Sequence, residues 1–139
     1  MSPLEKIYDV LNEKLELSKD EIDSIVKTNI YLKKVISADV IEVINKFEEM
    51  GLRYNEIKQI AIENPWILTE SFERINYLKH YYKLVELIDY RELLIKQPIS
   101  MSVNPREVKD LIARLQEQDK SNEDIRNILI NDFTKYISL

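Results

Sequence analysis

Few residues of this 139-residue chain are of the types that carry out chemistry. The only histidine, His80, has no second histidine with which to bind a metal ion. No motif supplies the nucleophile and the orienting group that a histidine base needs. The chain has no cysteine, and its single glycine cannot form a glycine-rich phosphate loop. We therefore expect no catalysis, no metal site and no cofactor, and interpret His80 as a solvated or half-buried surface residue.

Cationic side chains are better candidates, because several take equivalent positions when the chain is aligned with itself. We call a set of equivalent positions in successive copies a column. The first column consists of Asp23, Lys58, Arg91 and Arg126, and all but Asp23 are cations. A second column contains Lys46, Tyr81 and Arg114. Stacked copies would place such residues about 10 Å apart, and a strip of cations with an aromatic ring among them can follow a phosphate backbone. The alternative is that these Lys and Arg residues only cover exposed helix faces.

Aromatic side chains form a second set of candidates. We expect Trp66 to fill a gap between repeats as a core or near-core residue, whereas an exposed tryptophan there would mark a partner-binding site. A single helix cannot turn three neighbouring tyrosines toward one core, so at least one must lie at the surface or in a groove: Tyr77, Tyr81 or Tyr82. The segment 77–82 is therefore our first choice for a contact site. The partner-contact candidates are Trp66, Tyr77 and His80.

Composition predicts an all-α protein. Hydrophobic residues make up 45% and charged residues 32% of the chain, as in folded soluble domains. One glycine and four prolines are too few for the turns of an all-β fold. The first residues are charged and amphipathic, unlike a signal peptide, and no apolar run has the length of a membrane span. We expect a soluble, cytoplasmic protein that has no contact with a membrane.

A repeat organises the chain, and residues 52–84 show it best. A first amphipathic helix is broken at Asn64-Pro65, and a short apolar turn then leads to a second helix. Proline lacks the amide proton that a helix interior needs and disfavours helix at the preceding residue. A shift of 33 residues places Gln97-Pro98 on Asn64-Pro65. Chance explains apolar matches between two amphipathic helices, but not a break at the same point.

This pattern predicts a right- or left-handed α-solenoid of about three and a half helix–short turn–helix repeats within a single domain, residues 1–139. The expected units are 1–16 (half), 17–51, 52–84, 85–118 and 119–139 (half). The expected helices are 3–15, 19–29, 38–50, 54–64, 72–86, 90–97, 105–117 and 122–131. Short helical turns are expected at 31–35, 65–69, 98–102 and 133–138.

Residues at helix ends support these bounds. Ser18 and Glu21 form a capping box at the start of one helix, and Asn104 is an N-cap that precedes proline. Gly51 stands where a left-handed C-cap would close a helix.

The residues that recur within 51–84 carry a family resemblance. They are Gly51, Leu52, Ile57, Asn64, Pro65, Leu68, Ser71, Ile75 and Leu78. With this pattern the segment resembles one repeat of the mitochondrial transcription termination factor (mTERF) family. The next unit is similar, through Leu93, Leu94, Gln97, Pro98, Val108 and Leu111. The resemblance implies a left-handed superhelix that binds nucleic acid through a basic inner surface in organellar gene expression. The chain departs from the pattern at Ile30 and Phe133, where the family has proline.

Two functional hypotheses follow. The first is a non-catalytic helical-repeat module that binds a macromolecule, nucleic acid being the ligand implied by the resemblance. The alternative is an acidic protein–protein interaction scaffold or accessory subunit, because the net charge is −5 and residues 1–52 hold seven Lys/Arg against eleven Asp/Glu. A homodimer through an uncovered terminal unit is a third arrangement, and the sequence leaves the oligomeric state open.

Overall fold

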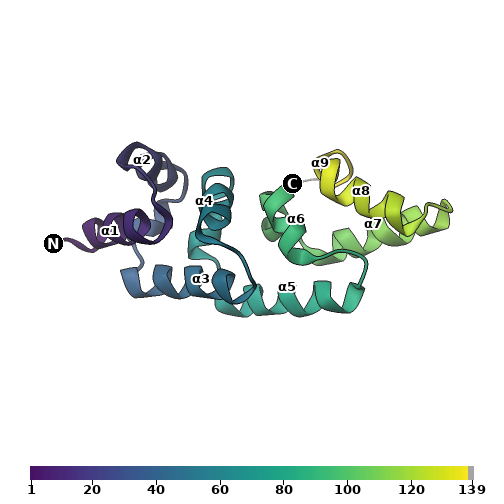
Figure 1. The fold of residues 1–139 in the computed structure, drawn as a ribbon, viewed down its shortest axis with the longest axis horizontal. Helices are drawn as coiled ribbons and strands as arrows, with labels where there is room; N and C mark the ends of the chain where they lie inside the picture. The colour runs from purple at the N-terminus through teal and green to yellow at the C-terminus, as the bar shows by residue number, and fades with distance from the viewer. Residues whose placement is uncertain (138–139) are drawn as a thin grey trace. The chain divides into compact units, whose positions relative to one another are not determined.

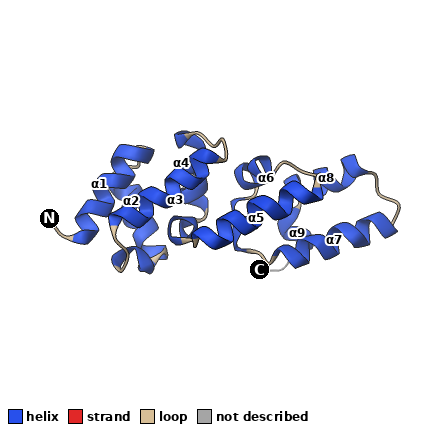
Figure 2. Ribbon diagram, turned by 90° about the horizontal axis from the view of Figure 1, so that it is seen from below, coloured by secondary structure: helices blue, strands red, loops and turns tan. Residues whose placement is uncertain are grey.

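The computed structural model describes residues 1–137, which contain helices and no strand (Figures 1 and 2), so the all-α prediction is confirmed. The α-helices are α1 (Pro3–Leu15), α2 (Lys19–Thr28), α3 (Ser37–Glu49), α4 (Tyr54–Glu63), α5 (Phe72–Val85), α6 (Tyr90–Lys96), α7 (Pro105–Glu117), α8 (Asn122–Asn131) and α9 (Phe133–Tyr136). Three short 3-10 helices lie between them: η1 (Ile30–Lys33), η2 (Pro65–Thr69) and η3 (Pro98–Ser102). Each expected helix and turn begins and ends within two residues of its predicted bounds, apart from the predicted end at residue 138, which lies outside the described residues.

Capping side chains start the helices where the sequence predicts. The Ser18 hydroxyl accepts a hydrogen bond from the Glu21 amide at 3.1 Å, and the Glu21 carboxylate accepts one from the Ser18 amide at 2.9 Å. Asn104 likewise accepts from the Arg106 amide at 3.0 Å. These bonds satisfy amides that the first turn of a helix leaves without a partner.

The end of α3 is closed by Gly51, at a φ of 92°. Its amide donates to the Glu48 carbonyl at 2.9 Å, and the Leu52 amide donates to Phe47 at 3.2 Å. This pair of bonds is a Schellman motif, which favours glycine because the left-handed conformation crowds a Cβ atom. The predicted C-cap is confirmed.

The break between the two helices of a repeat has the same backbone shape in three copies. The C-cap residue directly after the first helix is Asn29 (φ −101°, ψ 85°), Asn64 (φ −136°, ψ 81°) or Gln97 (φ −134°, ψ 75°). A 3-10 helix follows at once in each copy, including the first, which has Ile30 instead of proline. The order helix, 3-10 helix, helix thus occurs three times, as α2–η1–α3, α4–η2–α5 and α6–η3–α7.

The chain forms two compact units, Met1–Ile75 (unit 1) and Asn76–Leu139 (unit 2), with the boundary inside α5. In unit 1, α1 packs on α3 and α4, and η2 packs on α3 and α4. Its largest buried side chains include Ile7, Leu11, Ile44 and Phe47. In unit 2, α6 packs on η3 and α8, and α8 packs on α7 and α9, around Leu93, Leu111, Leu129 and Phe133. Continuous stacking of the copies as one solenoid domain, and its handedness, stay predictions.

Candidate binding surfaces

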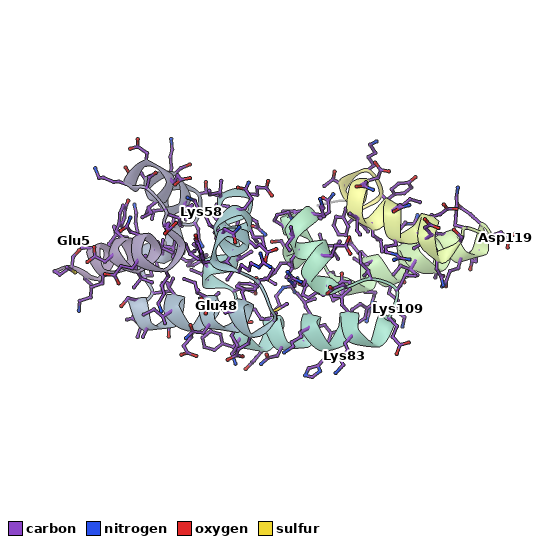
Figure 3. The ribbon with its side chains drawn as sticks, in the orientation of Figure 1. Glu5, Glu48, Lys58, Lys83, Lys109 and Asp119 are labelled. Atoms are coloured by element: carbon purple, nitrogen blue, oxygen red, sulfur yellow. The ribbon has the colours of Figure 1, made fainter. Side chains whose placement is uncertain are left out.

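Lys58, the first cation of its column, is labelled among the side chains of Figure 3 and is held by residues of its own unit. Its Nζ donates to the carbonyl oxygen of Glu16 at 3.0 Å and lies 3.8 Å from Oε1 of Glu21. The pKa of Glu21 is lowered, chiefly by its hydrogen bond from the Ser18 backbone and further by the charge of Lys58. Lys58 therefore links α4 to the end of α1 and the first turn of α2, which favours a structural role for its ammonium group.

The other members of the two columns differ in exposure. Lys46 on α3, Tyr81 on α5 and Arg91 on α6 are half-buried, whereas Arg114 on α7 and Arg126 on α8 are exposed. Lys46 and Lys58 belong to unit 1 and the remaining four residues to unit 2. The alignment of these residues as continuous stripes stays a prediction.

Trp66 is not a core residue, so that expectation is wrong. Its side chain is 41% exposed, because the single short turn of η2 directs Ile67 and Leu68 into the core instead. The indole meets the ring of Tyr31 edge-on, with 5.9 Å between the centroids, and Tyr31 is itself 52% exposed. Lys34 Nζ lies 5.7 Å from the centroid of the Tyr31 ring. We call Tyr31 and Trp66 the aromatic pair; they take equivalent positions in η1 and η2.

The three tyrosines of α5 divide as expected. Tyr82 is 1% exposed and stacks in parallel on Tyr90, with 4.5 Å between the ring centroids. Tyr77 is 57% exposed and stacks on Tyr81 at 6.3 Å. His80 is exposed, which confirms its interpretation as a surface residue.

Tyr77 and Tyr81 also line a polar groove of about 490 Å³ in unit 2. Its other lining residues belong to the N-terminal end of α7: Asn104, Arg106, Lys109 and Asp110. The pKa of Tyr81 is raised, first by burial and then by the charges of Tyr77 and Asp110. We call this site the tyrosine groove. It combines stacked rings with two cations, and the sequence pointed to its tyrosines but not to Arg106 and Lys109.

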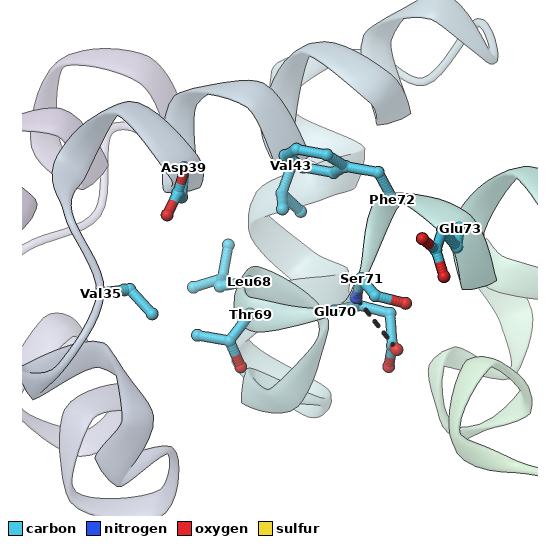
Figure 4. A pocket seen from close by; sticks show the side chains of 9 residues that line it. All are labelled: Val35, Asp39, Val43, Leu68, Thr69, Glu70, Ser71, Phe72 and Glu73. Carbon is cyan, nitrogen blue, oxygen red and sulfur yellow. Dashed lines mark hydrogen bonds between the residues drawn. The ribbon is translucent and has the colours of Figure 1, made fainter.

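A second groove, of about 400 Å³, lies within unit 1 (Figure 4). It is bounded by α3 and by Val35, two residues before that helix, by η2 and by the start of α5, and we call it the apolar groove. Its lining residues are Val35, Asp39, Val43, Leu68, Thr69, Glu70, Ser71, Phe72 and Glu73. The sequence did not single out this site, because its walls come from segments about one repeat apart.

Neither groove is lined by a histidine. Among residues 1–137, no group of three or more His, Asp or Glu side chains could hold a metal ion. None of the helices described there combines the length and the apolar content that a membrane span needs. What the two grooves and the aromatic pair provide is apolar, aromatic and charged surface.

The fold and these surfaces define an all-α protein built from helix–3-10–helix repeats. Comparison of the chain with models of protein families, with curated proteins and with solved structures finds no match. The resemblance of residues 51–84 to an mTERF repeat therefore stays a prediction.

Proposed function

We propose that this chain is a non-catalytic helical-repeat module, stacked as an α-solenoid, that binds another protein through unit 1. The observation that carries the proposal is the exposed aromatic pair. Tryptophan and tyrosine dominate the residues that contribute most to protein–protein affinity. A tryptophan left at the surface where a repeat offers an adjacent core is therefore best explained by a partner.

The charge of unit 1 also favours a protein partner. Residues 1–75 hold ten Lys/Arg and fifteen Asp/Glu, whereas residues 76–139 hold ten of each. Unit 1 therefore carries the whole net charge of −5, which repels the phosphates of nucleic acid and attracts basic proteins. It also carries most of the exposed large hydrophobic residues, including Ile30, Ile36 and Phe72.

Substitution of the aromatic pair tests this function. In a pull-down, we expect one defined protein to be recovered in constant ratio to the wild-type chain. Trp66→Glu should abolish this recovery, because it places a charge at the centre of the surface formed by the aromatic pair. Tyr136→Ala is the matched control, because Tyr136 is an aromatic residue of unit 2 with similar exposure, 47%. Circular dichroism verifies that both variants fold. Equal recovery with Trp66→Glu and the wild type would contradict the proposal.

Nucleic acid, the ligand that the mTERF resemblance implies, is the second candidate, and the tyrosine groove favours it. Stacked Tyr77 and Tyr81 offer faces for bases, while Arg106 and Lys109 offer charges for phosphates. Unit 2 has no net charge to oppose such binding.

Fluorescence anisotropy with labelled single- and double-stranded DNA and RNA separates the nucleic-acid versions. Affinity must fall steeply with salt, because counterions are released on binding. If nucleic acid binds in the tyrosine groove, Arg106→Gln/Lys109→Gln should weaken the complex. If it binds along the cation columns, Arg114→Gln/Arg126→Gln should weaken the complex instead. Absence of binding at low salt excludes both.

A further inference from the structure

The apolar groove has a floor of four apolar side chains: Val35, Val43, Leu68 and Phe72. Val43 and Leu68 are continuous with the core of unit 1, at 2% and 1% exposure. Phe72 is 37% exposed and in Figure 4 extends toward Val43 across one end of the groove. The apolar surface that folding of unit 1 leaves uncovered here therefore belongs to Phe72 and to the half-buried Val35.

The rim of the same groove is acidic. Asp39, Glu70 and Glu73 surround the apolar floor (Figure 4). Glu70 accepts a hydrogen bond from the Ser71 amide at 3.2 Å and lies 3.7 Å from Nε of Arg74, so its charge is partly compensated. Asp39 and Glu73 are exposed, and neither forms an ion pair in the described part of the chain. Two carboxylates therefore face solvent beside apolar surface without a cation.

We propose that the apolar groove binds an amphipathic helix of a partner protein, with apolar residues on one face and Lys or Arg along its flanks. The inference rests on the proposed protein-binding function and names the chemistry of the partner. Apolar anchors at positions i, i+3 or i+4, and i+7 would pack against Val35 and Phe72, above the buried Val43 and Leu68, as in helix-in-groove recognition. Cations on the flanks would pair with Asp39 and Glu73 and set the orientation of the helix.

Other occupants fit the groove less well. A nucleic acid or an anionic membrane surface would bring negative charge against the acidic rim. A peptide that binds by adding a β-strand would need a sheet edge to pair with, and residues 1–137 contain no strand. A second copy would have to offer a basic helix with a free apolar face, but α5, the most basic of the described helices, already buries its apolar face through Ile75, Leu78 and Tyr82.

A designed peptide provides a direct test with the full chain. The probe is a fluorescein-labelled helix of four turns, with leucines on one face and lysines elsewhere. One control peptide replaces every lysine by glutamate, and another has the same composition in an order without an apolar face. We expect the probe to bind at least about tenfold more tightly than either control, because both apolar and charged contacts are required.

Variants locate the binding. Asp39→Asn/Glu73→Gln and, separately, Phe72→Ala should each weaken probe binding by about five- to tenfold. Glu48→Gln/Glu49→Gln is the matched control, since it removes the same charge from exposed residues, on α3, that do not line the groove. Equal affinity of the groove and control variants, or equal binding of the glutamate peptide, would overturn the proposal.

Two further outcomes bear on the same proposal. Displacement of the probe by single-stranded RNA, or formation of a dimer that excludes the probe in sedimentation, would identify a different occupant and overturn it. Failure of this proposal can be told apart from failure of the proposed function. The partner protein that Trp66→Glu loses would then still be captured by Asp39→Asn/Glu73→Gln and by Phe72→Ala. The chain would in that case bind a protein, but not through the apolar groove.

Discussion

At the scale of single residues, the amides that end the first helices have a role beyond the break itself. Asn29 donates through Nδ2 to the carbonyl oxygen of Pro65 at 3.0 Å and to Oγ1 of Thr69 at 2.9 Å, both in the next copy. Gln97 also donates to the following copy, but to a carbonyl oxygen within α8, that of Ile130, at 2.6 Å. A buried carbonyl needs a donor, and an amide at the break supplies one to the neighbouring repeat.

The first prediction concerns Asn29, which is completely buried. Asn29→Ala should lower the free energy of unfolding by about 2 kcal/mol, because it leaves the Pro65 carbonyl and Thr69 hydroxyl without this donor. Asn29→Asp should cost more, since a carboxylate turns acceptor oxygens toward a carbonyl. Urea denaturation measures both. The control, Asn55→Ala on the exposed face of α4, should change the value by about 0.5 kcal/mol at most; equal losses at both positions would contradict the role of Asn29.

The second prediction concerns pH. The Tyr8 hydroxyl donates to Oδ1 of Asp23 at 2.5 Å, and this hydrogen bond, with burial and the charge of Asp23, raises the pKa of Tyr8 from 10.0 to about 12. Between these two values the unfolded chain loses the phenol proton while the folded chain retains it. The stabilisation is therefore complete below pH 10 and is lost as the pH rises toward 12.

Comparison of the wild type with Tyr8→Phe isolates this titration, because the other tyrosines and lysines titrate in both proteins. The wild type should be the more stable protein at pH 8, and the difference should shrink between pH 10 and pH 12. Denaturant titrations at a series of pH values provide the measurement. A difference that stays constant over this range would show that the hydrogen bond does not hold the proton.

At the scale of elements, local chemistry was sufficient to predict the helices. Capping by Ser18 and Asn104, closure at Gly51 and the break at Pro65 each depend on a few neighbouring residues, so sequence shows them directly. Contacts between distant segments were not visible. Lys58 binds a carbonyl oxygen 42 positions away, and nothing in its local sequence indicates that partner.

The candidate surfaces were predictable only in part, for the same reason. The amphipathic pattern of α5 implied that Tyr77, Tyr81 and Tyr82 must divide between core and surface. The burial of Trp66 depended on which side chains a single 3-10 turn directs inward. In the structure Ile67 and Leu68 pack into the core, and Trp66 lies at the surface. The amides at Asn29 and Gln97 could have been noticed, since a polar residue with an NH₂ group recurs at the break.

The third prediction compares two helix ends. Gly51 at φ 92° and Asp119 at φ 58° both take the left-handed conformation, and both are followed by an amide that donates five residues back, from Leu52 to Phe47 and from Lys120 to Leu115. Gly51→Ala should lower the free energy of unfolding by about 1 kcal/mol, and Asp119→Gly should raise it by up to about 1 kcal/mol. Thermal denaturation reports both; shifts of the same sign would contradict left-handed strain as the cause.

At the scale of the whole molecule, the repeats and the charge divide the chain differently. The helix–3-10–helix order occurs on both sides of residue 75, and α5 itself crosses that point. Net charge does not continue across it, because unit 1 holds the whole of the −5 and unit 2 is neutral. This asymmetry supports different ligands for the two halves: a basic protein helix for unit 1, and a polar or phosphate-bearing ligand for the tyrosine groove of unit 2.

The last prediction tests the single repeat domain. In stacked repeats each copy is stabilised by its neighbours, so a destabilised copy weakens those beside it.

Leu111→Ala removes a side chain that is 1% exposed in the core of unit 2 and should lower the free energy of unfolding by about 3 kcal/mol there. If the copies form one domain, native-state hydrogen exchange should show faster exchange not only in α7 and α8 but also, to a smaller extent, in α4 and η2. Leu15→Ala in unit 1 is the reciprocal experiment and should speed exchange in α6. Changes confined to the substituted unit in both experiments would contradict the single-domain prediction, because two independent folding units would then account for the chain.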